Sequence, residues 1–519
     1  MARELTTPVA IFGHMGTPRT IPRELQDFLQ LPGAQSLLLR GPPGSGKTSL
    51  SLALLESFSG ARYFVTNRVP GDDVRLSFPW LTNRNGHHID MIDNTSPDPG
   101  LARASEVLTR HSSRLLEDSS PAARELAEFL WLPSPLQDAW SRLDPARSSL
   151  VVIDSWDALV ESYIGDRPTM LGQDLPTRAE IERALLRRMG TSRTHIVFVL
   201  EREEQTQLDY LVNGVAVTSR EVIDGRLERW LTLFKLRGVR IETAHYPFSL
   251  EGAHFECITP VRAYQQIQGG GFDRAPDPMP DHLWPGSRAF AESFGRLPLG
   301  KSTLLEVDKD VPNQVPYVLL APIVAHTLER NGRVIFVPDA STLPDDIWDS
   351  FHNAVERRRF VDQVRFLMPP AGPNEQKSEF ESTIVRPGAP SGPGSAAAGM
   401  NLDEFLRTGA TPESPGLFVV FLQGLVAIAA ARGFTVGGDL ALRLPGQIQA
   451  AVRGAPLHAL AVGSSDSPLF DPLRPTAALR LHLRQRQGRV LVYGSDPWTP
   501  TFLLTEGHDN SPYGLLRVV

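Results

Sequence analysis

The residues best suited to chemistry lie in the stretch 41–48, which reads GPPGSGKT and follows the apolar run 36–40. This is the G-x-x-x-x-G-K-[ST] spacing of a phosphate-binding loop between a strand and a helix. Glycines let the backbone curl so that successive N–H groups point at one anion, and Lys47 reaches the β- and γ-phosphates. Thr48 places its hydroxyl on Mg²⁺, and the following helix directs its positive end at the phosphates. The predicted nucleotide-binding residues are Gly41, Pro42, Pro43, Gly44, Ser45, Gly46, Lys47, Thr48 and Ser49.

A second part of such a site is a buried strand that ends in a carboxylate, at residues 149–155 with the sequence SLVVIDS. Because the carboxyl ends of parallel strands meet at one edge of a sheet, Asp154 would lie beside the loop and hold Mg²⁺ through water. The sequence therefore predicts Thr48 and Asp154 as the metal site. ATP with Mg²⁺ is the expected cofactor, and the residues leave the choice between ATP and GTP open.

Strands and helices that alternate along the chain must position these residues. Apolar runs at 36–40, 61–66, 149–155 and 194–200 alternate with helical patterns, which favours a parallel sheet flanked by helices. Short β segments between 214 and 258 are joined by polar turns and predict an antiparallel extension of this sheet. The stretch from about 101 to 145 predicts a helical insertion.

Composition limits the class of protein. A chain of 519 residues with 41% hydrophobic residues is expected to fold into more than one globular domain. The net charge of −7 disfavours a generally basic nucleic-acid-binding body. The single cysteine, Cys257, excludes a disulfide framework and a cysteine-rich zinc site, which fits a reducing cytoplasm. No run of eighteen apolar residues occurs, so no membrane association is expected.

Further residues resemble the RecA-superfamily ATPases of the KaiC/GvpD type. The resemblance covers 22–260 and rests on the phosphate-binding loop, the strand ending in Asp154, and the segments 231–238, LTLFKLRG, and 246–250, YPFSL. It implies that Lys235 and Arg237 reach the γ-phosphate held by a neighbouring subunit, and hence a homo-oligomer of two to six subunits. The layout leans toward GvpD, which implies control of a transcription regulator through protein contact.

One departure from the family concerns hydrolysis. KaiC-like members carry a Glu-Glu pair at the end of the second strand, where one carboxylate orients the attacking water. Here Thr66 is followed by Asn67 and Arg68. Hydrolysis is therefore expected to be weak or conditional, since general-base help is typically worth ~10²–10⁴-fold. The carboxylates that could substitute are those of Asp72, Asp73, Glu201 and Glu203.

The second half of the chain predicts a repeat of the first. After the first domain, 1–264, and a linker at 265–286, residues 297–305 correspond to 31–39. The literal phosphate-loop match at 295–302 is rejected, because a strand pattern follows it where the motif needs a helix. The corresponding slot is 308–317, which has no glycine and two aspartates, and Leu422 is expected where Asp154 stands in the first half.

The predicted fold class is therefore α/β, with two RecA-like (P-loop NTPase) domains, each a mainly parallel sheet flanked by helices with an antiparallel extension. The second domain, 287–519, is expected to lack a nucleotide site and to contain a disordered loop at about 369–400, which is rich in Gly, Pro, Ser and Ala.

Three functions remain open from the sequence. The leading hypothesis is a cytoplasmic, ATP-binding regulatory protein that acts as a nucleotide-dependent switch on a protein partner. The second is a recombination mediator that binds single-stranded DNA, which would need basic, mobile loops near the centre of a ring or filament. Basic patches such as 357–359 could contact nucleic acid or acidic proteins, although solvated helix and strand faces are the default interpretation. The third is a scaffold that nucleotide stabilises without turnover.

Overall fold

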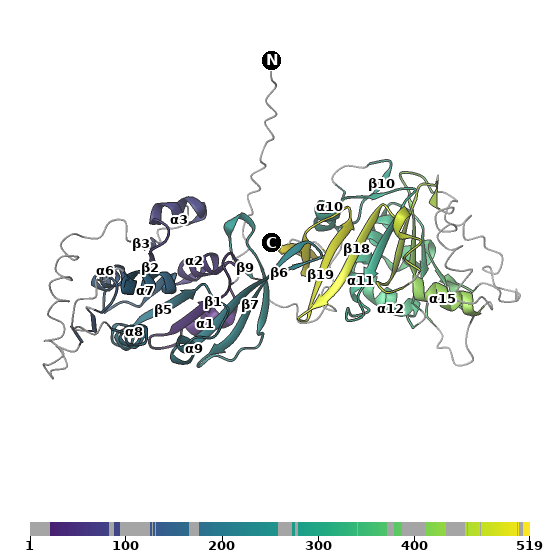
Figure 1. Cartoon of the computed structure of the whole chain (residues 1–519). Coiled ribbons are helices and arrows are strands. Elements are labelled where there is room, and N and C mark those ends of the chain that lie inside the picture. Colours follow the sequence, from purple (N-terminus) through teal and green to yellow (C-terminus); the bar gives the residue numbers. More distant parts are fainter. Residues whose placement is uncertain are drawn as a thin grey trace, which may run out of the picture. The chain divides into compact units, whose positions relative to one another are not determined.

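The computed structural model describes residues 21–82, 88–93, 125–126, 128–129, 131–165, 176–257, 272–275, 279–339, 341–370, 378–386, 410–431, 452–453, 455–467, 469–505, 507 and 512–518. The chain divides into two compact units (Figure 1). The first comprises 1–223, 228–259 and residue 519, and the second comprises 224–227 and 260–518. Each unit contains one large, mostly parallel sheet flanked by helices, as the sequence predicts.

The sheet of the first unit has the strand order β3-β2-β4-β5-β1-β6-β7-β8-β9. Its first six strands in this order pair in parallel, and β8 pairs antiparallel with both β7 and β9. The antiparallel extension is thus confirmed. The strands are β1 (Ser36–Arg40), β2 (Ala61–Thr66), β3 (Asp90–Ile92), β4 (Ser149–Asp154), β5 (Thr194–Leu200), β6 (Gly214–Ile223), β7 (Arg226–Leu236), β8 (His245–Ser249) and β9 (Glu256–Cys257).

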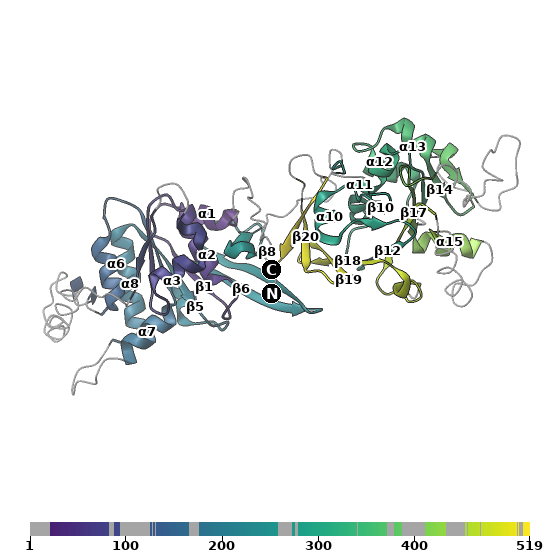
Figure 2. The same cartoon turned by 90° about the horizontal axis from the view of Figure 1, so that it is seen from above.

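Both faces of this sheet are covered, and the central strands β1 and β5 are buried at every position. Leu37 and Leu39 belong to one hydrophobic core together with α1 and α2, whereas Leu38 belongs to a second core with α6, α7 and α8. Figure 2 shows α6, α7 and α8 grouped along one side of the unit. The helices are α1 (Arg23–Leu29), α2 (Lys47–Ser57), α3 (Gly71–Ser77), α6 (Ser134–Arg142), α7 (Trp156–Gly165), α8 (Arg178–Ser192) and α9 (Gln207–Leu211).

The large sheet of the second unit has the order β15-β14-β13-β16-β17-β12-β18-β19-β20-β21. Its strands are parallel from β15 to β18 and antiparallel from β18 to β21. The strands are β12 (Ser302–Val307), β13 (Val334–Val337), β14 (Val364–Leu367), β15 (Ile384–Val385), β16 (Gly416–Phe421), β17 (Leu457–Ser464), β18 (Leu479–Arg486), β19 (Arg489–Asp496), β20 (Thr501–Thr505) and β21 (Gly514–Val518). A small sheet pairs β10 (His282–Leu283) with β11 (Leu297–Pro298).

The two faces of this second sheet are also covered. One core includes residues of α10 to α13, and the other includes residues of α15. The helices are α10 (Arg288–Phe294), α11 (Val315–Glu329), α12 (Pro344–Phe351), α13 (Arg357–Gln363) and α15 (Leu422–Ala431).

Strand register relates the two sheets residue by residue. In the first, Asp154 pairs with Val199, which pairs with Leu39. In the second, Phe421 pairs with Val462, which pairs with Leu305. Strands β4 and β16 both have six residues, and with their ends aligned Leu305 corresponds to Leu39, as the predicted repeat requires. Phe421 occupies the position of Asp154, so the expectation that Leu422 stands there is wrong by one residue.

Two stretches expected to be irregular contain ordered elements. Within 369–400, residues 378–386 form a short 3₁₀ turn and strand β15, which pairs with β14, because Phe380 and Ile384 supply buried apolar side chains. Within the expected linker, β10 pairs with β11 and Trp284 is buried. Most of the helical insertion, 101–124, and the remainder of 387–400 lie outside the described residues.

Candidate functional site

The loop between β1 and α2 has the curled backbone that the sequence predicts. Gly41, Gly44 and Gly46 have φ values of 154°, 72° and 90°. A Cβ atom on Gly41 would lie 2.2 Å from the carbonyl oxygen of Thr218, and one on Gly46 would lie 2.9 Å from the ring of Phe248. Glycine is therefore needed here for both conformation and space.

Lys47 begins α2 and folds back under this loop. Its Nζ donates hydrogen bonds to the carbonyl oxygens of Gly41, at 2.9 Å, and Pro42, at 2.7 Å. Burial lowers the pKa of Lys47, and the nearby carboxylates of Glu201 and Asp154 act in the opposite direction. The ammonium group is thus held at the base of the loop by carbonyl groups, which phosphate oxygens could replace.

Two arginines add positive charge around the same loop. The guanidinium of Arg220, on β6, lies against Gly44, where an added Cβ would be 2.9 Å from its Nη1. Arg68, which follows β2, also lies close enough to lower the pKa of Lys47. Three cations from separate elements therefore lie close to the glycine loop, which is an electrostatic environment for an anion.

Ser45 connects the loop to strand β6 through a side-chain hydrogen bond. Its Oγ donates to the carbonyl oxygen of Pro42 at 2.7 Å and lies 2.7 Å from Oγ1 of Thr218. Thr218 is one residue beyond Val217, which pairs with Arg40 at the end of β1. The position of Thr218 and Arg220 could not be read from the sequence, because their contacts to the loop span more than 170 residues.

Thr48 and Asp154 meet as the sequence predicts. The Thr48 Oγ1 donates to Oδ2 of Asp154 at 2.7 Å. Burial raises the pKa of Asp154, while the Thr48 hydrogen bond and the Lys47 charge oppose this shift. A hydroxyl and a carboxylate in contact beside a phosphate-binding loop fit a Mg²⁺ ion that also binds phosphate oxygens and water. No group of three or more His, Cys, Asp or Glu residues suited to a metal occurs among the described residues.

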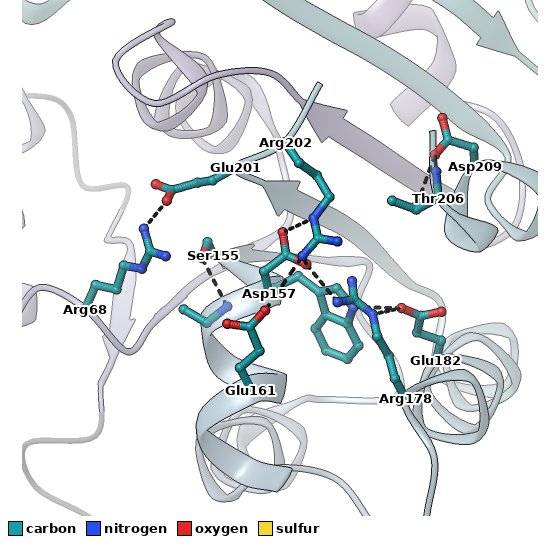
Figure 3. Close-up of polar contacts among 12 residues, drawn as sticks. Arg68, Ser155, Asp157, Glu161, Arg178, Glu182, Glu201, Arg202, Thr206 and Asp209 are labelled. Carbon is teal, nitrogen blue, oxygen red and sulfur yellow. Dashed lines mark hydrogen bonds and ion pairs between the residues drawn. The ribbon is translucent and has the colours of Figure 1, made fainter. Parts of the chain in front are cut away.

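The carboxylate nearest this centre comes from the end of β5. Glu201 directly follows β5 and forms an ion pair with Arg68 (Figure 3). Of the four carboxylates considered as substitutes for the missing Glu-Glu pair, only Glu201 influences the pKa of Lys47. Asp72, Asp73 and Glu203 are exposed. No local pattern in the sequence reveals the Arg68–Glu201 contact, because 133 residues separate the two.

Arg202, the next residue, points the other way and anchors this segment. Its guanidinium contacts the buried carboxylate of Asp157 on α7, with Nε at 3.1 Å and Nη2 at 3.0 Å (Figure 3). Arg178 on α8 contacts the same carboxylate at 2.8 Å and reaches Glu182 at 2.9 Å. This ion-pair network fixes the backbone that carries Glu201, and it ties that backbone to α7 and α8.

Trp156 belongs to the same network. Its ring is fully buried and its Nε1 donates to Oε1 of Glu182 at 3.0 Å. The carboxylates of Asp157 and Glu182 are buried, whereas the side chains of Arg178 and Arg202 are 30% and 41% exposed, so water reduces the cost of losing either arginine.

Lys235 and Arg237 lie away from the loop. The N–H of Arg237 donates to the carbonyl of Asn213, whose own N–H donates to the carbonyl of Ser36 at the start of β1. The phosphate-binding loop follows the other end of β1, five residues away, which corresponds to roughly 15 Å. Within one chain, therefore, these residues and Lys47 do not form one site.

The side chain of Lys235 is engaged locally. Its Nζ donates to the carbonyl oxygen of Asp209 at 2.8 Å, and burial, followed by the Arg237 charge, lowers its pKa. The Asp209 carboxylate pairs with the buried guanidinium of Arg40 at 3.2 Å. The hydrogen bond from Lys235 to the Asp209 carbonyl would have to break for Lys235 to reach a phosphate elsewhere.

Replacing Asp154 by asparagine tests the electrostatics of the site. Because the folded pKa of Asp154 lies above the ordinary value, the folded state holds this proton more tightly than the unfolded state does. Stability is then lost as pH rises from about 4 through the folded pKa. Asp154→Asn should therefore raise the unfolding temperature at pH 7, by roughly 2–4 °C per kcal/mol of relieved cost, and less at pH 4. Thermal unfolding without Mg²⁺ or nucleotide measures this.

The exposed aspartate Asp73, changed to asparagine, provides the control and should show no comparable gain. A lower unfolding temperature of Asp154→Asn at pH 7 would show instead that Thr48 and Lys47 more than compensate the buried charge.

Comparison with known proteins places this geometry in context. No protein-family model matches the chain. The chain is 26% identical over 373 residues to Protein GvpD1 of Halobacterium salinarum, a match that covers 69% of this chain and 64% of GvpD1. It is 27% identical over 383 residues to Protein GvpD2 of the same organism, covering 71% of each. The match thus spans less than two thirds of the length of GvpD1.

No helix in the described part of the chain is both long and apolar enough to cross a bilayer. The chain is similar to the GvpD proteins, and its two mainly parallel sheets flanked by helices are consistent with two RecA-like α/β domains.

Proposed function

We propose that the first unit binds ATP with Mg²⁺ and that this protein is a regulatory switch whose state depends on the bound nucleotide. The observation that carries the proposal is the glycine loop under which Lys47 is buried, with Arg68 and Arg220 beside it. Burying an ammonium group costs free energy. An anion bound at this loop would supply the missing countercharge.

Each residue has a defined part in binding. The loop N–H groups and Lys47 would hold the phosphates, with Lys47 exchanging the carbonyl oxygens of Gly41 and Pro42 for phosphate oxygens. Thr48 and Asp154 would hold Mg²⁺, which neutralises phosphate charge when bound. Arg220 would contact phosphate from the β6 side.

The Arg68–Glu201 ion pair would make ATP hydrolysis conditional. Arg68 stands where the family has a carboxylate, and its guanidinium forms an ion pair with the carboxylate of Glu201. A γ-phosphate at Lys47 would attract Arg68, because the guanidinium would then face a larger negative charge than one carboxylate. Glu201 would be released and could accept a proton from a water molecule beside the γ-phosphate. Hydrolysis would then be weak and would depend on the position of Arg68.

The Asp157 network offers a route by which this change reaches a protein partner. Glu201 and Arg202 are adjacent, and Arg202 is held by α7 and indirectly by α8. Movement of Glu201 would strain contacts to both helices. The similarity to GvpD proteins supports a regulatory role, and a transcription regulator is the proposed partner. We also propose a homo-oligomer of two to six subunits, in which Lys235 and Arg237 reach a neighbour's γ-phosphate.

Nucleotide binding is tested by comparing two lysine variants. Lys47→Ala removes a charged hydrogen-bond donor from the site and should weaken ATP binding by about 10–100-fold, the range for a charge-assisted contact of ~1.5–3 kcal/mol. Lys301→Ala is the matched control, because Lys301 belongs to the second phosphate-loop pattern but is exposed and precedes strand β12. Titration with a fluorescent ATP analogue in the presence of Mg²⁺ gives both affinities. Unchanged binding by Lys47→Ala, or equal loss in Lys301→Ala, would refute the assignment.

Hydrolysis is tested by separating Arg68 from Glu201. Arg68→Ala should raise the rate of phosphate release several-fold, because Glu201 would no longer be held. Glu201→Gln should lower the rate by ~10²-fold or more, as expected for loss of a general base. Steady-state phosphate release at saturating ATP measures both.

Glu203→Gln serves as the control, since Glu203 is exposed two residues further along. Two results would contradict the mechanism: a Glu201→Gln rate equal to that of the parent protein, or an Arg68→Ala rate as low as that of Glu201→Gln. The second result would assign Arg68 a stabilising role on the phosphate. Absence of turnover in the parent protein and in all variants would favour the scaffold function.

A further inference from the structure

The second unit contains a cavity of about 310 Å³ at the carboxyl edge of its large sheet. Its walls come from the ends of β12, β13, β16 and β17 and from the start of α11. The lining includes Asp308, Val311, Tyr317, Asp339, Phe421 and Val462. This volume lies at the lower end of the range of ~300–1,000 Å³ that is typical of small-molecule sites.

Register places this cavity where the first unit has its phosphate-binding loop, but its chemistry is different. Phe421 replaces Asp154, and the segment 308–314 replaces the loop 41–46. That segment contains no glycine, so it cannot present a curl of N–H groups in the same way. Asp308 and Asp339 would repel phosphate. The cavity is therefore not suited to a nucleotide.

Two stacked aromatic rings form one wall. The rings of Tyr317 and Phe421 have centroids 5.0 Å apart and planes inclined by 22°. Burial raises the pKa of Tyr317, so its phenol stays neutral at physiological pH. A neutral aromatic face attracts a cation through the ring quadrupole.

The charges of the lining have the complementary sign. Asp308 and Asp339 are half-buried carboxylates, and the Asp308 Oδ1 accepts a hydrogen bond from Ser465 Oγ at 3.1 Å. Lys309 also lines the cavity, but its side chain is exposed and pairs at 2.7 Å with Asp466, outside the lining. Among the described lining residues, two carboxylates thus face one ammonium group that is already paired elsewhere.

We propose that this cavity binds a small organic cation, with an ammonium or guanidinium group between the carboxylates and the aromatic wall and an apolar portion against Val311 and Val462. The second unit would then sense a small molecule at the position where the first unit senses nucleotide. This inference is independent of nucleotide binding by the first unit.

The test is calorimetric titration of the full chain with three amines of different shape, agmatine, spermidine and benzylamine, with adenosine and inorganic phosphate as comparison ligands. At least one amine should bind. Asp308→Asn should weaken that binding by about tenfold or more, the effect of losing one charge-assisted contact. Phe421→Leu should also weaken it, since the apolar volume remains but the ring is lost. Lys47→Ala should leave it unchanged.

Asp310→Asn is the matched control, because Asp310 lies on the same segment, is exposed and is absent from the lining. Thermal unfolding of each variant confirms that it is folded. The proposal is overturned if no amine binds, if Asp310→Asn weakens binding as much as Asp308→Asn does, or if adenosine or phosphate binds instead in a manner sensitive to Asp308→Asn.

Discussion

The buried ammonium group of Lys47 is the charge around which the first unit is arranged. Two carbonyl oxygens of its own loop hold it, and the glycines of that loop allow the chain to curl over it. Asp154 and Glu201 arrive from the ends of β4 and β5, which neighbour each other in the sheet. Parallel pairing makes this possible, because it brings the carboxyl ends of strands from distant parts of the chain to one edge.

The second unit shows how far the same topology permits different chemistry. The order and register of the central strands are the same in both units. In the second unit, however, Phe421 occupies the position of Asp154, and two carboxylates lie near the position of the phosphate-binding loop. The position of Arg40, which pairs with Asp209, is taken by Glu306, which pairs with Arg474 at 2.8 Å. The strand residue of this ion pair is basic in the first unit and acidic in the second, and its partner has the opposite charge in each case. The fold therefore keeps a pair at this position and not a particular sign of charge.

The sequence predicts those parts of the molecule that depend on local pattern. The phosphate-binding loop, the strand ending in Asp154 and the rejection of the second motif each rest on a few consecutive residues, and the structure has β12 where a helix would be needed. The Arg68–Glu201 and Ser45–Thr218 contacts join residues 133 and 173 positions apart, so no local pattern reveals them. The run 418–422, FVVFL, does not specify where its strand ends, which is why the sequence predicts Leu422 at the position that Phe421 occupies. Strand β15 was missed because a few apolar residues lie within a stretch rich in Gly and Pro.

The central claim is that one unit holds the nucleotide while the other, with the same topology, does not. Hydrogen–deuterium exchange of the full chain with and without Mg²⁺ and ATP tests this claim most directly. The account predicts slower exchange in 41–58 and a change at 199–203, with no change in 308–317. Equal protection of 308–317, or no protection of 41–58, would contradict it.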